Sequence, residues 1–411
     1  MTENISNTIP SKKINIYDKL LILLLALQVF GDIGEGFQPI RVFVILCIPF
    51  ILYFCEKDST IRYNFRYERY FFLFWAIYAS LSLFLSFDLT KSIKEVLYLI
   101  VNFFSYFTLI YFSSKASSPK SSIIKGWILL FLLLCPFSLY ELWTDNHLNV
   151  FDLNRASLIR ENRRYTAVSF ANINRLNTVL MYIIPFMFGC LLTFKKRKIF
   201  QWGICLMLSY IILSNGSRGA AVCIFLGWIF FITFYFFKTL NKNAIKSALF
   251  IFIILIAGVF IISSFDETFT TIANRFSKRG FQDPTRANII NLAIEELQNT
   301  YFLGVGAGNF SPLMEHAHQL KISSPHNLFI EIITQYGIII FALFLGLFVR
   351  LFLKQKANRN NSDKFVVILS LSILPFLSVI DSSYILRANI WLFLASLAII
   401  SDRKYNIAYY D

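Results

Sequence analysis

The chain contains a nearly uncharged run at residues 327–349, which reads NLFIEIITQYGIIIFALFLGLFV. An α-helix rises about 1.5 Å per residue, so roughly twenty such residues cross a hydrocarbon layer about 30 Å thick. Glu331 is the single charged residue in this run. Similar runs recur along the whole chain, and they lack the strict alternation of β-barrel strands. We therefore expect an all-α membrane protein.

The composition agrees with this class. The 411 residues are 56% hydrophobic, their mean hydropathy is +0.60 and they include 46 Phe, which excludes an ordinary soluble domain. We expect a polytopic protein with about twelve transmembrane helices and one integral membrane domain over residues 1–411. The expected spans are approximately 15–33, 38–55, 70–87, 95–113, 122–143, 174–194, 199–214, 219–237, 246–265, 327–349, 365–381 and 386–401.

Basic residues orient these spans. The net charge of +15 is compatible with nucleic-acid binding, but basic loops that hold membrane helices on the cytoplasmic side explain it better. With a cytoplasmic N-terminus, 24 of the 39 lysines and arginines fall in the inner segments. The alternation holds through twelve spans, so both termini are expected in the cytoplasm.

The two sides also differ in residue type. Only 7 of the 24 inner basic residues are arginine, against 11 of the 15 outer ones. All four histidines are also expected on the outer side: His147, His316, His318 and His326. A guanidinium matches phosphate geometry and an imidazole moves a proton near neutral pH, so the outer loops are candidates for phosphate and proton chemistry. Chance is the alternative explanation.

Cysteine and histidine spacing predicts neither disulfides nor a metal site. The six cysteines fall in or at the ends of the spans, and no Cys/His cluster has the spacing of a zinc site. No cofactor is expected.

A short outer turn, Ser214-Asn215-Gly216-Ser217-Arg218-Gly219, joins the seventh and eighth spans. Glycine permits the tight reversal, and Arg218 stands where a helix N-terminus already favours an anion. The alternative is a plain hairpin with an arginine reaching the membrane surface. We favour an anion-binding role for Arg218.

The longest connection, residues 266–326 between the ninth and tenth spans, holds three further features. Asp283-Pro284-Thr285-Arg286 predicts a helix start, and Ile289, Ile290, Ala293, Ile294 and Leu297 follow at helical spacing, so an amphipathic helix presents Arg286. Gly304-Val305-Gly306-Ala307-Gly308 resembles a phosphate loop but follows no strand, so a tight or flexible turn is expected instead. His326 ends the loop as a candidate general base or an interfacial residue.

Two groups of arginines complete the outer side. Arg155, Arg160, Arg163 and Arg164 share the 144–173 loop with Asp152 and Glu161, which fits either a solvated loop or phosphate capture. Arg387 follows Asp381 by six residues at the last outer turn. Either a structural ion pair or a site residue is consistent with that spacing.

Several of these segments together resemble the O-antigen ligase and polymerase superfamily of bacterial membrane glycosyltransferases. The matching pieces are Phe170-Ala171-Asn172-Ile173-Asn174, Ser217-Arg218-Gly219-Ala220, Arg286, Leu303-Gly304-Val305-Gly306-Ala307-Gly308-Asn309-Phe310, and Pro325-His326-Asn327-Leu328 with Glu331 and Gly337. No piece is specific alone, but their order and spacing cover nearly the whole chain.

The resemblance implies an inner-membrane enzyme that takes a glycan from undecaprenyl diphosphate on the periplasmic face. It implies two essential arginines and one histidine, which by motif are Arg218, Arg286 and His326. The arginines would stabilise the diphosphate leaving group, and the histidine would deprotonate the acceptor hydroxyl in one inverting displacement. Arg155, Arg160, Arg163, Arg164 and Arg387 are secondary candidates for binding the diphosphate or glycan.

The acceptor separates two alternatives within that superfamily. A ligase passes the glycan to a sugar of the lipid A core, whereas a polymerase passes it to another lipid-linked repeat. The His-Asn motif and the Asp381–Arg387 spacing favour a ligase here, with a polymerase as the alternative. A lipid-linked glycan transporter is less consistent, because charges buried within spans and repeated halves are not evident.

Overall fold

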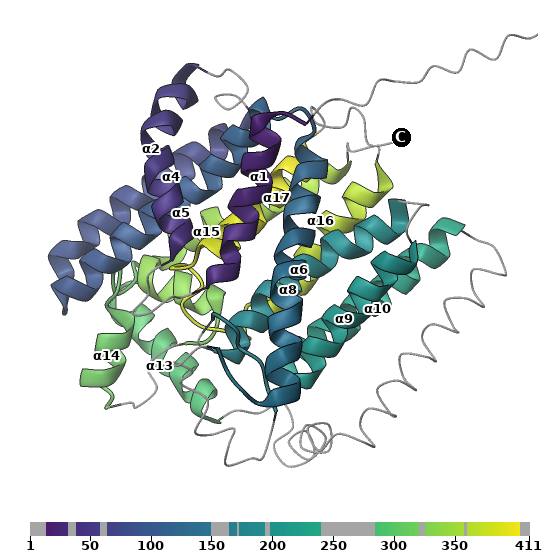
Figure 1. Ribbon diagram of the computed structural model, residues 1–411. Helices are drawn as coiled ribbons and strands as arrows, with labels where there is room; N and C mark the ends of the chain where they lie inside the picture. The colour runs from purple at the N-terminus through teal and green to yellow at the C-terminus, as the bar shows by residue number, and fades with distance from the viewer. Residues whose placement is uncertain are drawn as a thin grey trace, which may run out of the picture.

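The computed structural model describes residues 14–31, 38–57, 64–148, 164–170, 172–193, 198–239, 284–319, 325–356 and 360–402. Helices dominate these residues, and no strand occurs among them. The elements are α1 (Ile16–Ala26), η1 (Leu27–Phe30), α2 (Pro39–Lys57), α4 (Arg66–Leu81), η2 (Ser82–Leu85), α5 (Leu89–Lys115), α6 (Pro119–Thr144), α8 (Ile173–Thr193), α9 (Lys198–Ser214), α10 (Arg218–Thr239), α13 (Pro284–Asn299), α14 (Phe310–His316), α15 (Leu328–Lys356), α16 (Asn361–Leu377) and α17 (Ala388–Ser401) (Figure 1).

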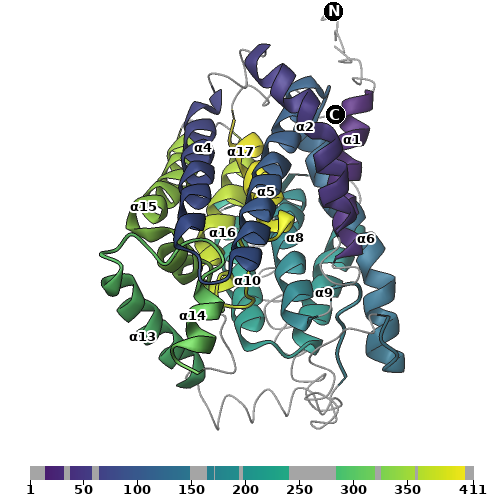
Figure 2. The same cartoon turned by 90° about the vertical axis from the view of Figure 1, so that its left-hand side faces the viewer.

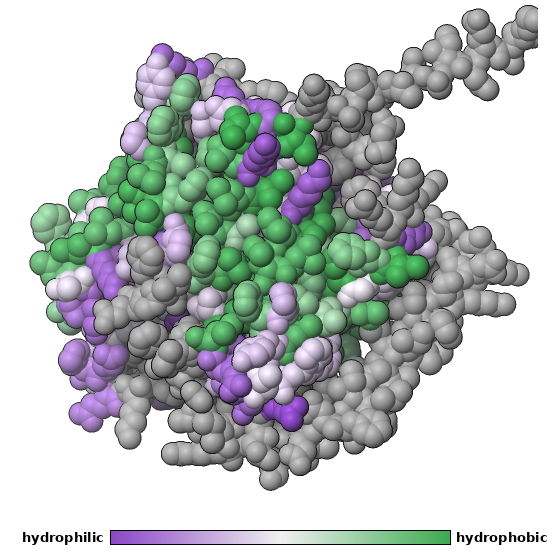
Figure 3. All heavy atoms as spheres, viewed as in Figure 1, coloured by the Kyte–Doolittle hydropathy of each residue, from purple (hydrophilic) through white to green (hydrophobic). Residues whose placement is uncertain are grey.

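Helices occupy eleven of the twelve expected spans, and the span expected at 246–265 lies outside the described residues. Among the described residues, five helices are long and apolar enough to cross a membrane: α5, α6, α8, α10 over 218–235 and α15 over 328–355. Shorter apolar helices lie at 39–54, 198–214 and 388–401. Apolar side chains cover the middle of the face in Figure 3, and polar ones gather towards its ends. A helical, polytopic membrane protein is thereby confirmed.

Two helices form the centre of the bundle. Seventeen of the 21 residues of α8 and thirteen of the 14 residues of α17 are buried. α8 packs against α6, α9, α10 and α16, while α17 packs mainly against α5. Because both helices are enclosed by protein, their apolar sequences serve packing between helices rather than contact with lipid.

Buried polar contacts fasten one end of the bundle, where α1 begins and α17 ends. The carboxylate of Asp18 accepts hydrogen bonds from Ser118 N at 3.0 Å and Ser122 Oγ at 2.8 Å, which joins α1 to α6. Lys120 Nζ lies 2.7 Å from Asp363 Oδ2 and donates to Ile400 O at 2.9 Å. These bonds join α6, α16 and α17. Helices α13 and α14 lie at the opposite end of the bundle (Figure 2).

The run at 327–349, which we expected to be one uninterrupted span, is broken at Gly337, where φ is +77°. Residues 302–306 supply hydrogen-bond partners for the backbone at this break. Val305 N donates to Thr334 O at 2.8 Å, and Gly306 N donates to Gln335 O at 2.9 Å. On the other side of the kink, Ile338 N donates to Phe302 O at 3.0 Å. Backbone groups that the kink frees from the helical ladder are therefore paired within the protein. The loop is tightly turned, as expected.

The predicted amphipathic helix is α13. Its buried side chains, Ile289, Ala293 and Leu297, are spaced by four residues, and the first two pack with Phe310 and Met314. Ile294, which we expected on the same face, is 45% exposed. α13 therefore lies over the first half of α15, with a narrower apolar stripe than the sequence pattern indicated.

Candidate active site

The three motif-bearing segments meet at one short stretch, residues 378–380, which follows α16. Arg286 Nη1 of α13 donates to Val379 O at 2.8 Å. Leu328 N, at the start of α15, donates to Ser378 O at 3.0 Å. A Cβ built on Gly219 of α10 would lie only 3.1 Å from Ile380 Cγ1, so this glycine permits close packing of α10 on the stretch. The structure thus brings the Arg218, Arg286 and His326 segments to one end of the bundle.

Arg218 is the first residue of α10, and Arg286 is the third residue of α13. Both side chains are partly exposed. The first turn of a helix carries unsatisfied backbone N–H groups and partial positive charge, which add to a guanidinium in attracting an anion. A guanidinium has five N–H donors, so Arg286 can bond a carbonyl and a phosphate at the same time. The arrangement suits a doubly charged phosphate group.

His326 has a left-handed backbone conformation, with φ of +46°. Such a φ is uncommon for residues other than glycine and persists only where neighbouring contacts hold it. The side-chain oxygen of the next residue, Asn327, accepts hydrogen bonds from Phe329 N at 2.9 Å and Ile330 N at 3.3 Å. Asn327 therefore caps α15 directly after His326.

The turn between α16 and α17 contains the ion pair that the spacing allowed. Arg387 Nη1 lies 3.7 Å from Asp381 Oδ2, and both side chains are largely buried. Glu331, in the first turn of α15, accepts a hydrogen bond from Tyr384 N at 3.1 Å. These contacts stabilise the 378–387 turn that carries the meeting point, so a positioning role for Arg387 is the one with structural support.

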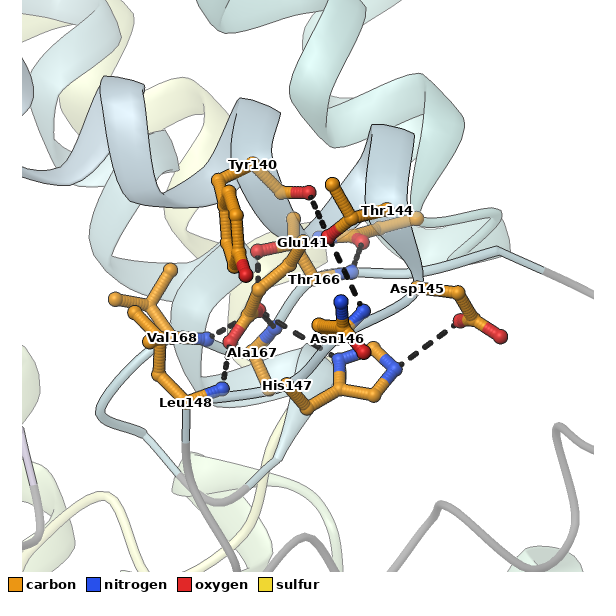
Figure 4. A network of polar contacts seen from close by, with 11 residues as sticks. Tyr140, Glu141, Thr144, Asp145, Asn146, His147, Leu148, Thr166, Ala167 and Val168 are labelled. Atoms are coloured by element: carbon orange, nitrogen blue, oxygen red, sulfur yellow. Dashed lines mark hydrogen bonds and ion pairs between the residues drawn. The ribbon is translucent and has the colours of Figure 1, made fainter.

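Sequence reasoning missed Glu141, at the end of α6 (Figure 4). Its carboxylate is fully buried and accepts four hydrogen bonds: from Leu148 N, Thr166 Oγ1 and Ala167 N at 2.8 Å and from Val168 N at 2.9 Å. A charged residue inside an apolar run was the signal that could have identified it.

His147 lies beside this carboxylate and stacks on Tyr165, with ring centroids 4.0 Å apart. Its Nδ1 is 3.8 Å from Glu141 Oε2, and its Nε2 is 3.2 Å from Asp145 Oδ1. Burial acts to lower the pKa of His147, but the hydrogen bonds and negative charges of Glu141 and Asp145 outweigh it and raise the pKa. The two carboxylates therefore stabilise the protonated form of the imidazole.

The Glu141 network continues to the turn before Arg218. Thr166 N donates to Asn215 Oδ1 at 2.8 Å, and Asn215 Nδ2 donates to Asn177 Oδ1 at 2.8 Å. Asn215 is fully buried and stands three residues before Arg218. Two consecutive contacts thus connect Glu141 with the segment that presents Arg218.

The remaining arginines and histidines of the sequence analysis add little to the geometry of this site. Arg155, Arg160 and Arg163 lie outside the described residues, and Arg164 is exposed. His318 Nε2 lies 2.8 Å from Glu296 Oε1, which joins the end of α14 to α13. Among the described residues, no group of three or more His, Cys, Asp or Glu side chains is placed to hold a metal ion.

Comparison with known proteins agrees with this geometry. Residues 203–345 match the family model of the O-antigen ligase, a range that includes Arg218, Arg286 and His326. The chain is also 26% identical over 289 residues to the teichuronic acid biosynthesis protein TuaE of Bacillus subtilis (strain 168). That alignment covers 68% of this chain and 58% of the relative. The chain therefore spans little more than half of the length of that relative. Residues 203–345 are thus similar to the O-antigen ligase family, and the resemblance that the motifs predicted is confirmed over that range.

Proposed function

We propose that this protein is a membrane glycosyltransferase that transfers a glycan from undecaprenyl diphosphate to a sugar hydroxyl. The observation that carries the proposal is the convergence of the Arg218, Arg286 and His326 segments on residues 378–380. The matched family region supports the reaction class. Twelve spans, two cytoplasmic termini and a site on the periplasmic face of the inner membrane are part of the same proposal.

In the proposed reaction, the acceptor oxygen attacks the anomeric carbon as the bond from that carbon to the phosphate oxygen breaks. Negative charge builds on the departing undecaprenyl diphosphate, and Arg218 and Arg286 stabilise it from two helix N-termini. His326 takes the hydroxyl proton. A single displacement of this kind inverts the anomeric centre.

We take the acceptor to be a sugar of the lipid A core, as in a ligase. The alternative acceptor is a second lipid-linked repeat, as in a polymerase. The similarity to a protein whose name refers to teichuronic acid biosynthesis favours retaining that alternative. A transporter for the lipid-linked glycan is the least supported alternative, because it gives no role to the convergence of the Arg218, Arg286 and His326 segments.

The test is complementation of a deletion strain, followed by gel analysis of its glycolipids. Arg218→Lys, Arg286→Lys and His326→Ala should each lose transfer, because a lysine lacks the fork of the guanidinium and each arginine is expected to contribute about 2–4 kcal/mol. Lys91→Ala, an exposed change at the same end, should retain activity.

The outcomes separate the alternatives. Loss of core-attached glycan with accumulation of long lipid-linked polymer identifies a ligase, whereas core carrying single repeats identifies a polymerase. Full transfer by Arg218→Lys would refute the proposed diphosphate clamp.

A further inference from the structure

A groove of about 540 Å³ lies between α4 and α15, away from the candidate active site. It is lined mainly by Arg66, Tyr70, Phe71 and Phe74 of α4 and by Leu343 and Arg350 of α15. Leu343 is fifteen residues beyond the start of α15, which corresponds to about 20 Å along a helix. The two helices lie side by side in Figure 2. The groove is therefore a separate feature of the bundle.

Arg350 is held rigidly at one end of the groove. Its Nη2 donates to Asn64 O at 2.7 Å, and its Nε lies 3.3 Å from Glu68 Oε1. Glu68 is fully buried, and its charge balances that of Arg350. Tyr67 contributes its ring, whose centroid lies 5.8 Å from the guanidinium carbon of Arg350. A planar donor group is thus fixed at the groove wall.

Arg66 adds a second guanidinium at the same end. It is exposed, it is the first residue of α4, and its guanidinium carbon lies 5.6 Å from the centroid of the Tyr70 ring. No acidic side chain is among the residues that line the groove, so its lining carries two guanidinium groups, which are complementary to a phosphate.

The rest of the groove is apolar and continuous with an exposed hydrophobic face. Tyr70 is 62% exposed and Phe74 is 42% exposed, and Leu73 and Ile77 extend the same surface along α4. Large exposed apolar residues on a membrane helix face acyl chains. The groove therefore presents two arginines to a headgroup and aromatic side chains to the chain attached to it.

We propose that the groove binds an anionic phospholipid, with its phosphate between Arg66 and Arg350 and an acyl chain along Tyr70, Phe71 and Phe74. A phospholipid fits better than a peptide because charge and apolar surface are arranged along the helix axis, as they are in a lipid. The groove lies at the end of the bundle where α1 begins, which is the proposed cytoplasmic side and the side where basic pockets bind anionic headgroups. The site does not depend on the proposed glycan transfer.

Native mass spectrometry of the full-length protein, depleted of lipid, tests this site. Dioleoyl phosphatidylglycerol and dioleoyl phosphatidylcholine have the same chains and differ in charge. The wild type should bind phosphatidylglycerol more tightly, and Arg66→Gln should weaken that binding about fivefold while leaving phosphatidylcholine unchanged. Phe74→Ala should weaken both lipids, because it shortens the apolar wall.

Lys57→Gln is the matched control, because Lys57 is also an exposed basic residue, near the last turn of α2. It should leave the lipid preference of the protein intact. Equal binding of the two lipids by the wild type would overturn the proposal. An equal loss of phosphatidylglycerol binding in Lys57→Gln and Arg66→Gln would also overturn it, since that result would indicate general attraction to positive charge.

Discussion

Replacing Glu141 with alanine should release the loop that leads to the Arg218 turn. The Glu141 carboxylate accepts bonds from Leu148, Thr166, Ala167 and Val168 at 2.8–2.9 Å. A hydrogen bond to a charged group contributes about 1.5–3 kcal/mol, but water at the end of the bundle would satisfy some of the released donors. We therefore expect the free energy of local opening to fall by about 3–5 kcal/mol, the range for losing one partner of a buried ionic contact.

Hydrogen exchange measured by mass spectrometry, with the protein in lipid nanodiscs, reports this change. A loss of 3 kcal/mol corresponds to exchange about 100-fold faster at the amides of Ala167 and Val168. Glu141→Gln retains one acceptor oxygen, so it should give an intermediate rate. Glu295→Ala, an exposed change on α13, should not alter exchange in this loop.

The same Glu141→Ala variant tests whether the network positions Arg218. Peptides that cover Asn215 should exchange faster as well, and glycan transfer should fall although the protein still inserts. Unchanged protection of Ala167 and Val168 would refute the assignment of Glu141 as the acceptor that holds the loop. Faster exchange there with normal protection at Asn215 would instead limit its role to the loop itself.

Three further predictions follow from particular contacts. Because the pKa of His147 is raised in the folded protein, its stabilisation of the loop is complete below the ordinary value of about 6.5 and is lost as pH rises through the folded value. Loop exchange, corrected for intrinsic rate, should therefore quicken above about pH 6.5, and His147→Gln should remove that step. Gly337→Ala should destabilise the protein by about 1–3 kcal/mol in thermal unfolding, because its φ is +77° and a Cβ would contact Leu303 O. Gly203→Ala, on α9 with open space around it, should instead be neutral or stabilising by up to about 1 kcal/mol. Lys120→Met, which leaves Asp363 buried without its cation, should cost about 3–5 kcal/mol by the same assay, and adding Asp363→Leu should restore most of the loss.

The helices and most of their bounds could be predicted because apolar length is a local property of the sequence. The kink in α15 could not be predicted, even though Gly337 belongs to the segment that resembles the O-antigen ligase and polymerase superfamily. A glycine within an apolar run is compatible with a straight helix, and only the 302–306 loop, which bonds to the freed backbone groups, makes the broken form stable. The glycine-rich loop has a similar explanation, because Gly304 lies directly against the kink at Gly337, while Gly306 and Gly308 lie against Ser82 and Ser92.

The candidate site, too, could be predicted only in part from the sequence. Motif order alone predicted Arg218, Arg286 and His326 as site residues, but these residues are far apart in the chain. Their convergence depends on residues 378–380, which carry no motif and act through backbone carbonyls and one isoleucine. Backbone acceptors are present in every residue, so sequence cannot distinguish the ones that a tertiary fold will use.

The sequence by itself determined the class of the protein and the positions of its apolar segments. Those properties follow from the free energy of transferring each side chain into hydrocarbon, which depends on local composition. The tertiary structure alone decided which of the motif segments meet, that Asp381 pairs with Arg387, and that Glu141 holds a loop. Such contacts depend on how helices pack against one another, and each buried polar group is stable only where packing supplies its partner.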